Sequence, residues 1–233
     1  MRGTPANSVD IVLCTLYGRQ LAVLLLRDTS KRARWNLPWA PVATTVSLDD
    51  TAAQVAHRAA GARAHWLVQF GAFTDAGPHA GGSALSVAYV GVTPHDPGGP
   101  PAGAKWFPAA ELPPMPPRHR AEIGAALAQL RERLDRAPIA FRLLDSTFTL
   151  SELQSVYELL LSRRLHKASF RRALQAAFLV EPVDEWRSEG RGRPAQLFRY
   201  APRRRPGTRG GVRFELLRRL NAPVLWRYNK IVA

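Results

Sequence analysis

The segment from Thr149 to Tyr200 constrains the fold most, because its pattern specifies four elements in a fixed order. Thr149-Leu150-Ser151-Glu152 has the form of a capping box, in which the first and fourth residues cap a helix start reciprocally. Apolar residues then recur at helical spacing, at Leu153, Val156, Tyr157, Leu160 and Leu161. The spacing predicts an amphipathic helix that ends at a short break over 162–165.

A second helix is predicted from about Lys167 to Phe178. One face of it carries Phe170, Ala173, Leu174 and Ala177. Two strands, Leu179 to Trp186 and Gln196 to Tyr200, then bracket a tip rich in glycine and arginine over 187–194. Helix, short turn, helix and two-stranded hairpin is the order of a winged helix-turn-helix.

The charge of the chain is concentrated in this C-terminal part. Of a formal net charge of +15, residues 1–140 contribute 14 basic against 10 acidic side chains, and residues 141–233 contribute 19 against 8. A localised excess of Lys and Arg attracts polyanions, since each neutralised phosphate releases condensed counterions. The asymmetry favours nucleic acid as the partner, because an arginine-rich genome would enrich both parts alike.

The first 137 residues alternate strand and helix patterns. Strands are predicted over Val9 to Leu16, Leu21 to Leu26, Trp66 to Phe73 and Ser83 to Val92, with a short one at 105–107. A helix is expected from the N-cap Ser47 to Gly61, and another from about Arg118 to Arg136. The expected fold class is therefore α+β: an α/β/α sandwich over a mixed sheet, followed by the winged helix.

The stretch from Trp35 to Gly61, with Lys105-Trp106-Phe107 and Glu111-Leu112-Pro113, resembles the signature region of the Nudix superfamily. When the chain is aligned on Gly61, the positions of the family's glutamates hold Val46, Val55, Arg58 and Ala59. Such glutamates hold divalent cations, which need oxygen ligands. The resemblance therefore implies a domain without catalytic residues, and we expect no metal and no cofactor.

Side chains near the place where the family binds substrate still suit a nucleotide-like or phosphorylated ligand. The expected ligand-binding set, which pairs aromatic faces with positive charge, is Arg27, Arg32, Arg34, Trp35 and Trp39. Packing is the competing interpretation for both tryptophans. Trp39-Ala40 replaces the Gly-Gly pair of the enzymes, which indicates a narrowed or refilled pocket.

Phe148 to Glu158, Lys167, Phe170-Arg171-Arg172 and Gly190 to Ala195 together resemble the winged helix of the Nudix-related, NrtR-like transcriptional regulators. The resemblance implies a homodimeric repressor that binds a double-stranded DNA operator and responds to ADP-ribose, a similar metabolite or a phosphorylated sugar. The predicted DNA-binding residues are Arg163, Arg164, Lys167, Ser169, Arg171, Arg172, Gln175, Arg187, Arg191 and Arg193.

These observations predict three segments: an effector-sensing and dimerisation domain at 1–137, a DNA-binding domain at 138–201 and a basic tail at 202–233. We expect a cytoplasmic, nucleoid-associated protein, because no apolar stretch approaches the roughly 20 residues of a membrane span and residues 1–10 lack the pattern of a secretory signal. The lone Cys14 lies in an apolar run and is expected to be buried.

Two other functions remain open from the sequence. One is a Nudix-type hydrolase of a nucleoside diphosphate derivative that uses replacement carboxylates, with Asp49, Asp50 and Asp75 as candidates. The other is an RNA-binding protein, since basic winged helices also bind structured RNA.

Overall fold

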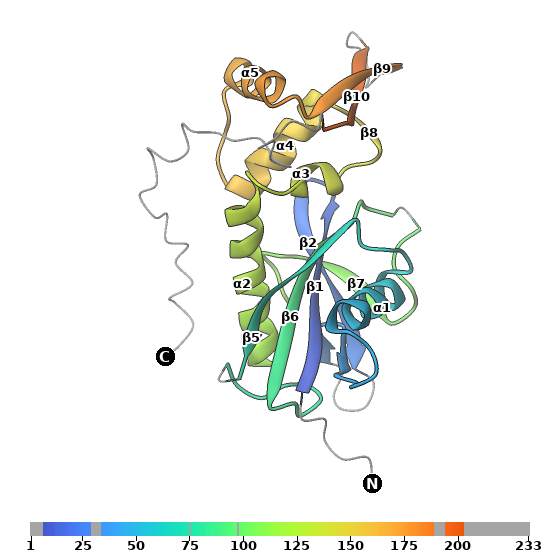
Figure 1. Ribbon diagram of the computed structural model, residues 1–233, viewed down its shortest axis with the longest axis vertical. Coiled ribbons are helices and arrows are strands. Elements are labelled where there is room, and N and C mark those ends of the chain that lie inside the picture. The colour runs from blue at the N-terminus through green and yellow to red at the C-terminus, as the bar shows by residue number, and fades with distance from the viewer. Residues whose placement is uncertain (1–6, 29–33, 75, 97, 189–193, 203–233) are drawn as a thin grey trace.

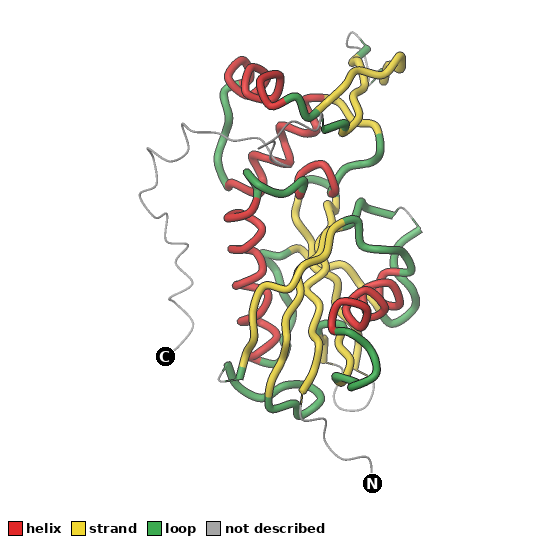
Figure 2. Tube along the Cα trace, viewed as in Figure 1, coloured by secondary structure: helices red, strands yellow, loops and turns green. Residues whose placement is uncertain are grey.

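The computed structural model describes residues 7–28, 34–74, 76–96, 98–188 and 194–202. A mixed sheet with one helix on each face forms the larger part, and a smaller helical part with a three-stranded sheet lies beyond one end of it (Figure 1). Figure 2 shows the same arrangement by type of secondary structure. The helices of the described residues include none that is long and apolar enough to cross a membrane.

Seven strands form the larger sheet. They are β1 (Asn7–Tyr17), β2 (Gln20–Asp28), β3 (Arg34–Asn36), β4 (Trp39–Pro41), β5 (Trp66–Phe73), β6 (Leu85–Val92) and β7 (Ala104–Pro108). The strand order is β3-β2-β1-β6-β5, with β4 also paired to β1 and β7 to β2. The pair β1–β6 is parallel and the other pairs are antiparallel, so the predicted mixed sheet is confirmed.

Alternation along β1 divides the core between the two faces of this sheet. Val9, Ile11 and Leu13 pack against α1 (Leu48–Ala60), while Val12 and Cys14 belong to the core on the side of α2 (Pro117–Arg133). Successive side chains of a strand point to opposite faces, so a continuous apolar run serves a sheet covered on both sides. Cys14 is fully buried, as predicted, and burial raises the pKa of its thiol to about 12.

The caps of α1 match the sequence prediction. The Ser47 hydroxyl accepts a hydrogen bond from the Asp50 N–H at 3.0 Å, and Gly61 ends the helix with φ of 74°. A glycine adopts this left-handed conformation without a steric cost, which is why helices often end there.

The smaller part has the element order of a winged helix. It consists of α3 (Ile139–Arg142), β8 (Thr147–Thr149), α4 (Leu150–Leu161), α5 (Lys167–Ala177), β9 (Val180–Arg187) and β10 (Ala195–Tyr200), with strand order β8-β10-β9. The capping box of α4 is complete: Thr149 Oγ1 accepts from the Glu152 N–H at 3.1 Å, and Glu152 Oε2 accepts from the Thr149 N–H at 2.7 Å. The two helices, the turn between them and the hairpin occur in the order that the sequence predicted.

The short elements β3, β4, α3 and β8 were not predicted. Each has three or four residues, which is too short for a hydrophobic period to develop. Their place is set by tertiary contacts instead: β8 pairs with β10, so Phe148 lies opposite Phe198, fifty residues away.

One apolar core runs through both parts of the chain. It joins Val12 of β1 and Leu130 of α2 with Tyr157 of α4 and Phe170 of α5. At the junction, Arg131 Nε of α2 donates to the Leu160 carbonyl of α4 at 3.0 Å. The winged helix is therefore packed against the end of the sandwich, and α2 is in contact with both.

Candidate nucleic-acid interface

Glu158 fixes the turn between the two helices of the helix-turn-helix. Its carboxylate accepts from the Leu165 N–H at 2.8 Å, from Gln154 Nε2 at 3.0 Å and from Arg164 at 3.3 Å. Burial favours the neutral carboxyl, but these three donors outweigh it and lower the pKa of Glu158. The carboxylate is therefore charged at neutral pH and holds α5 at a set angle to α4.

The exposed face of α5 carries most of the predicted DNA contacts. Phe170 and Leu174 are buried against α4, and the opposite face presents Lys167, Ser169, Arg171, Arg172 and Gln175, all exposed. Among the described residues, Lys167, Arg171 and Arg172 form no ion pair. Uncompensated cations on one face of the second helix of such a motif are what contact with base edges and phosphates requires.

The hairpin β9–β10 is tied to α4 at its base. Arg187 of β9 forms an ion pair with Glu152 at 2.7 Å and also donates to the Thr147 carbonyl at 3.5 Å. Arg187 was predicted to contact DNA, and the structure engages its guanidinium within the protein. The other predicted hairpin residues, Arg191 and Arg193, lie outside the described residues.

The two arginines of the turn differ in their surroundings. Arg164 is 91% exposed and pairs with Glu158. Arg163 is half-buried, and its Nε has no hydrogen-bond partner among the described residues. Both border a cleft between the turn and the β1–β2 hairpin.

The predicted ligand-binding residues of the sandwich lie on two faces of the sheet. Arg27 is paired directly with Trp35 across β2 and β3, so both point to the α2 side, whereas Arg34 is paired with Asp28 and points to the α1 side. The ring of Trp35 contacts Phe107, with 4.7 Å between centroids. Arg32 lies outside the described residues.

Trp39 is held by the loop that follows β5. Its ring lies 4.9 Å from that of His79, in an edge-to-face arrangement. Gly81 passes so close that a Cβ there would lie 2.2 Å from the Trp39 ring. The tryptophan that replaces the first glycine of the enzymes therefore fills the space at this turn.

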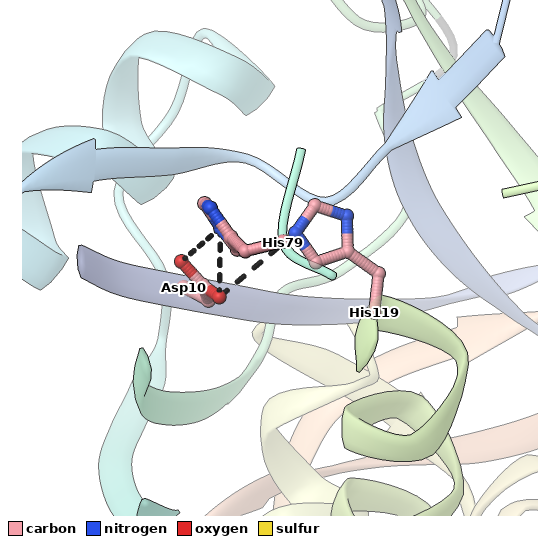
Figure 3. A group of neighbouring side chains, drawn as sticks. All are labelled: Asp10, His79 and His119. Carbon is pink, nitrogen blue, oxygen red and sulfur yellow. Dashed lines mark hydrogen bonds and ion pairs between the residues drawn. The ribbon is translucent and has the colours of Figure 1, made fainter. Parts of the chain in front are cut away.

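A buried polar cluster that the sequence did not indicate lies beside Trp39. Asp10 of β1, His79 and His119 of α2 bring their polar atoms within 4.8 Å of one another (Figure 3). His79 Nε2 contacts the Asp10 carboxylate at 3.2 Å, and His119 Nε2 lies 3.9 Å from it. The residues are far apart in sequence, so no spacing motif pointed to them; a charged Asp10 inside an apolar strand was the only signal.

The two histidines hold fixed tautomers, which disfavour a metal ion. His79 Nδ1 accepts from the Gly81 N–H at 3.0 Å, and His119 Nδ1 accepts from the Leu37 N–H at 3.1 Å. A neutral imidazole that accepts at Nδ1 carries its proton at Nε2. The Nε2 atoms that face Asp10 are thus donors, and coordination through them would require imidazolate.

Glu122 of α2 is buried next to this cluster. Burial and the nearby Asp10 raise the pKa of Glu122 to about 9, so it is protonated at neutral pH. Burial lowers the pKa of His119 to about 4, which keeps that ring neutral. Burial alone would raise the pKa of Asp10, but the hydrogen bond from His79 lowers it, so Asp10 is the charged member. Asp10 is therefore a buried carboxylate whose neighbours His119 and Glu122 are neutral.

Two of the three replacement carboxylates have structural partners. Asp49 accepts from the Tyr89 hydroxyl at 2.6 Å, and Asp50 accepts from the Ser47 hydroxyl at 2.7 Å at the start of α1. Asp75 lies outside the described residues. The two described carboxylates are thus committed to the packing and capping of α1.

Known proteins resemble both parts of the chain. Residues 140–200 match the model of the NrtR DNA-binding winged helix domain. The ADPR responsive transcriptional repressor NtrR of Acinetobacter baylyi is 36% identical over 83 residues, which is 36% of this chain and 33% of that protein. The match thus spans about a third of the curated relative.

Solved structures extend the likeness to the whole fold. NrtR of Shewanella oneidensis, crystallised with a 27mer DNA, has a TM-score of 0.75 and 27% identity, with 84% of this chain and 94% of that chain covered. A MutT/nudix family protein from Enterococcus faecalis has a TM-score of 0.65 at 19% identity, with 86% and 88% covered. The fold is therefore a Nudix-like sandwich followed by an NrtR-type winged helix, as the sequence predicted.

Proposed function

We propose that this NrtR-like chain is a DNA-binding transcriptional repressor whose Nudix-like domain senses ADP-ribose or a similar nucleotide. The observation that carries the proposal is the exposed basic face of α5, at Lys167, Arg171 and Arg172, within residues that match the NrtR winged helix. The similarity to a curated ADPR responsive repressor supports the effector class.

In this proposal α5 enters the major groove of duplex DNA. Arg171, Arg172 and Gln175 reach base edges and flanking phosphates, while Phe170 and Leu174 keep the helix seated on α4. The hairpin β9–β10 follows the backbone of the duplex, and we propose Arg191 and Arg193, which lie outside the described residues, as minor-groove or phosphate contacts. Arg187 acts as a positioning residue through Glu152.

We infer a homodimer that binds a palindromic operator, since two copies of one recognition helix read two half-sites about 34–36 Å apart. We assign effector binding and dimer contacts to residues 1–137 and DNA binding to residues 138–201. The tail at 202–233 is proposed as a further phosphate-binding segment. A regulator of this kind acts in the cytoplasm, at the nucleoid.

Helix α2 is the element that we propose to transmit effector binding. In its first turn, His119 Nδ1 accepts a hydrogen bond from the Leu37 N–H, next to the turn that carries Trp39. Its far end donates from Arg131 to the last turn of α4. A helix of 17 residues is about 25 Å long, so α2 reaches from the Trp39 turn to α4. A ligand at Trp39 therefore has a direct mechanical route to the helix-turn-helix.

We infer that the Nudix-like domain does not hydrolyse its ligand. Helix α1 contains no glutamate, and its buried face consists of Thr51, Ala52, Val55, Ala56 and Ala59. None of these side chains supplies a carboxylate, the hard oxygen ligand from which Nudix sites hold magnesium. Incubation with ADP-ribose and magnesium is expected to release no phosphate-containing product, and turnover would revive the hydrolase alternative.

An electrophoretic mobility assay tests the regulator directly. The probe is the DNA upstream of the chain's own gene at moderate salt, with a scrambled duplex and a structured RNA of equal length as competitors. The proposal predicts a protein–DNA complex that is displaced only by the unlabelled upstream duplex. ADP-ribose is expected to dissociate this complex. Equal competition by all three nucleic acids would contradict it.

A further inference from the structure

A cleft with a mixed polar and apolar lining separates the β1–β2 hairpin from helix α4. Its volume is about 790 Å³, within the range of small-molecule sites. The sandwich contributes Leu16, Gly18 and Arg19, and the winged helix contributes α4 and the turn after it, including Ser151, Ser155, Ser162, Arg163 and Arg164. Both domains therefore line the cleft.

The charge of the cleft is positive and partly uncompensated. Its two acids are engaged, Glu152 with Arg187 and Glu158 with the turn that it caps. Of its three arginines, Arg164 pairs with Glu158, whereas Arg19 and Arg163 form no ion pair among the described residues. The Nε of Arg163 is buried and has no acceptor among the described residues, so this guanidinium is not fully compensated within the protein.

We propose that this cleft binds a small phosphorylated anion, as a second ligand site distinct from the effector site at Trp39. Arg19 and Arg163 approach from the two domains, and guanidinium groups bind phosphate oxygens in bidentate fashion. The hydroxyl of Ser162 adds a neutral donor, whereas the hydroxyl of Ser155 donates to the Ser151 carbonyl. Leu16 of the sandwich and Val156 and Leu159 of α4 add apolar surface for the organic part of a ligand.

The cleft is separate from the proposed DNA-binding face, because the exposed face of α5 contributes no lining residue to it. An anion held by Arg19 and Arg163 bridges the domains, so it stabilises one orientation of the winged helix on the sandwich.

The test uses the full chain with pyrophosphate as the probe, titrated by calorimetry at constant ionic strength against sodium chloride. Arg163→Gln and Arg19→Gln are each expected to weaken pyrophosphate binding by at least tenfold. The matched control is Arg63→Gln, an exposed arginine in the loop after α1, which is expected to leave the affinity unchanged. Circular dichroism verifies that each variant is folded. Arg163→Lys keeps the positive charge but loses the bidentate guanidinium, so its affinity for pyrophosphate should lie between those of the wild type and Arg163→Gln.

Two further variants separate the possible sources of the signal. Arg27→Gln lies at the proposed effector site and Arg171→Gln on the DNA face, and both are expected to keep full pyrophosphate affinity. The site is overturned if Arg27→Gln abolishes binding and Arg163→Gln does not, or if the wild-type chain binds no pyrophosphate. It is equally overturned if Arg163→Gln weakens DNA binding alone. None of these results alters the test of DNA recognition itself.

Discussion

Arg187 of strand β9 forms an ion pair of 2.7 Å with Glu152, whose second carboxylate oxygen caps helix α4. The Glu152 side chain therefore holds both the start of the helix-turn-helix and the base of the wing, the hairpin β9–β10. Both side chains are about one-third exposed, at 35% and 32%, so solvent screens the pair.

We predict that Arg187→Gln weakens operator binding several-fold while it changes the free energy of unfolding by less than about 1 kcal/mol. The wing loses its anchor, but the capping bond from the Thr149 N–H remains. Denaturant unfolding and anisotropy on labelled operator measure the two effects. In a double-mutant cycle with Glu152→Gln, the affinity losses should be less than additive; simple additivity would show that Arg187 contacts DNA independently.

Loss of a single cation on α5 should change the salt dependence of binding. Arg171→Gln and Arg172→Gln are each expected to lower operator affinity and, where the side chain contacts phosphate, to reduce the slope of log K against log[salt] by about 1. The measurement is anisotropy across a series of salt concentrations, with Arg58→Gln as the charge-matched control. An effect of the same size in the control would mean that net charge, not the α5 face, determines affinity.

A methyl group at position 81 should disturb the effector turn. Gly81→Ala places a Cβ 2.2 Å from the Trp39 ring, so the indole or the loop must move. We expect a loss of stability of about 1–3 kcal/mol, as for other overpacked sites, and weaker ADP-ribose binding. Calorimetry with ADP-ribose measures the affinity. If the destabilised variant binds ADP-ribose with normal affinity, Trp39 does not belong to the proposed effector site.

The buried carboxyl of Glu122 should make stability fall as the pH rises from about 4.5 to about 9. Its pKa rises from 4.5 to about 9 on folding, so between these values the folded state holds a proton that the unfolded state releases. The stabilisation from this proton is complete below pH 4.5 and is lost as the pH approaches 9, with a slope of at most about 1.4 kcal/mol per pH unit.

Glu122→Gln is neutral at every pH, so its unfolding free energy should decline less between pH 7 and 9 than that of the wild type. His119, whose folded pKa is about 4, affects the slope only at lower pH. Asp10, whose pKa is lowered, is charged in both proteins over this range, and Arg118 is present in both. Parallel curves for variant and wild type would show that Glu122 is already ionised at neutral pH.

The sequence predicted the long elements because their signals are local. The capping box at Thr149 and Glu152, the caps of α1 at Ser47 and Gly61, and the apolar face of α5 are all set by residues within a few turns of one another. The exposed basic face of α5 followed from the same periodicity. These features required no knowledge of distant contacts.

The polar cluster and the interdomain cleft could not be predicted in this way. Asp10, His79 and His119 meet only because β1, the loop before β6 and the first turn of α2 converge at one end of the sheet. The engagement of Arg187 by Glu152 likewise depends on the register of the wing. Side-chain partners separated by tens of residues leave no periodic signal, so a solitary charged residue in an apolar strand is the most that a sequence offers.

The central claim is that a ligand of the Nudix-like domain controls DNA binding by α5. Its most direct test is fluorescence anisotropy of the full chain on labelled operator DNA, with ADP-ribose titrated at fixed moderate salt. The account predicts specific binding, lost for Arg171→Gln/Arg172→Gln, and release of the wild-type chain as ADP-ribose rises. No discrimination between operator and scrambled duplex, or a complex indifferent to ADP-ribose and related nucleotides, would contradict it.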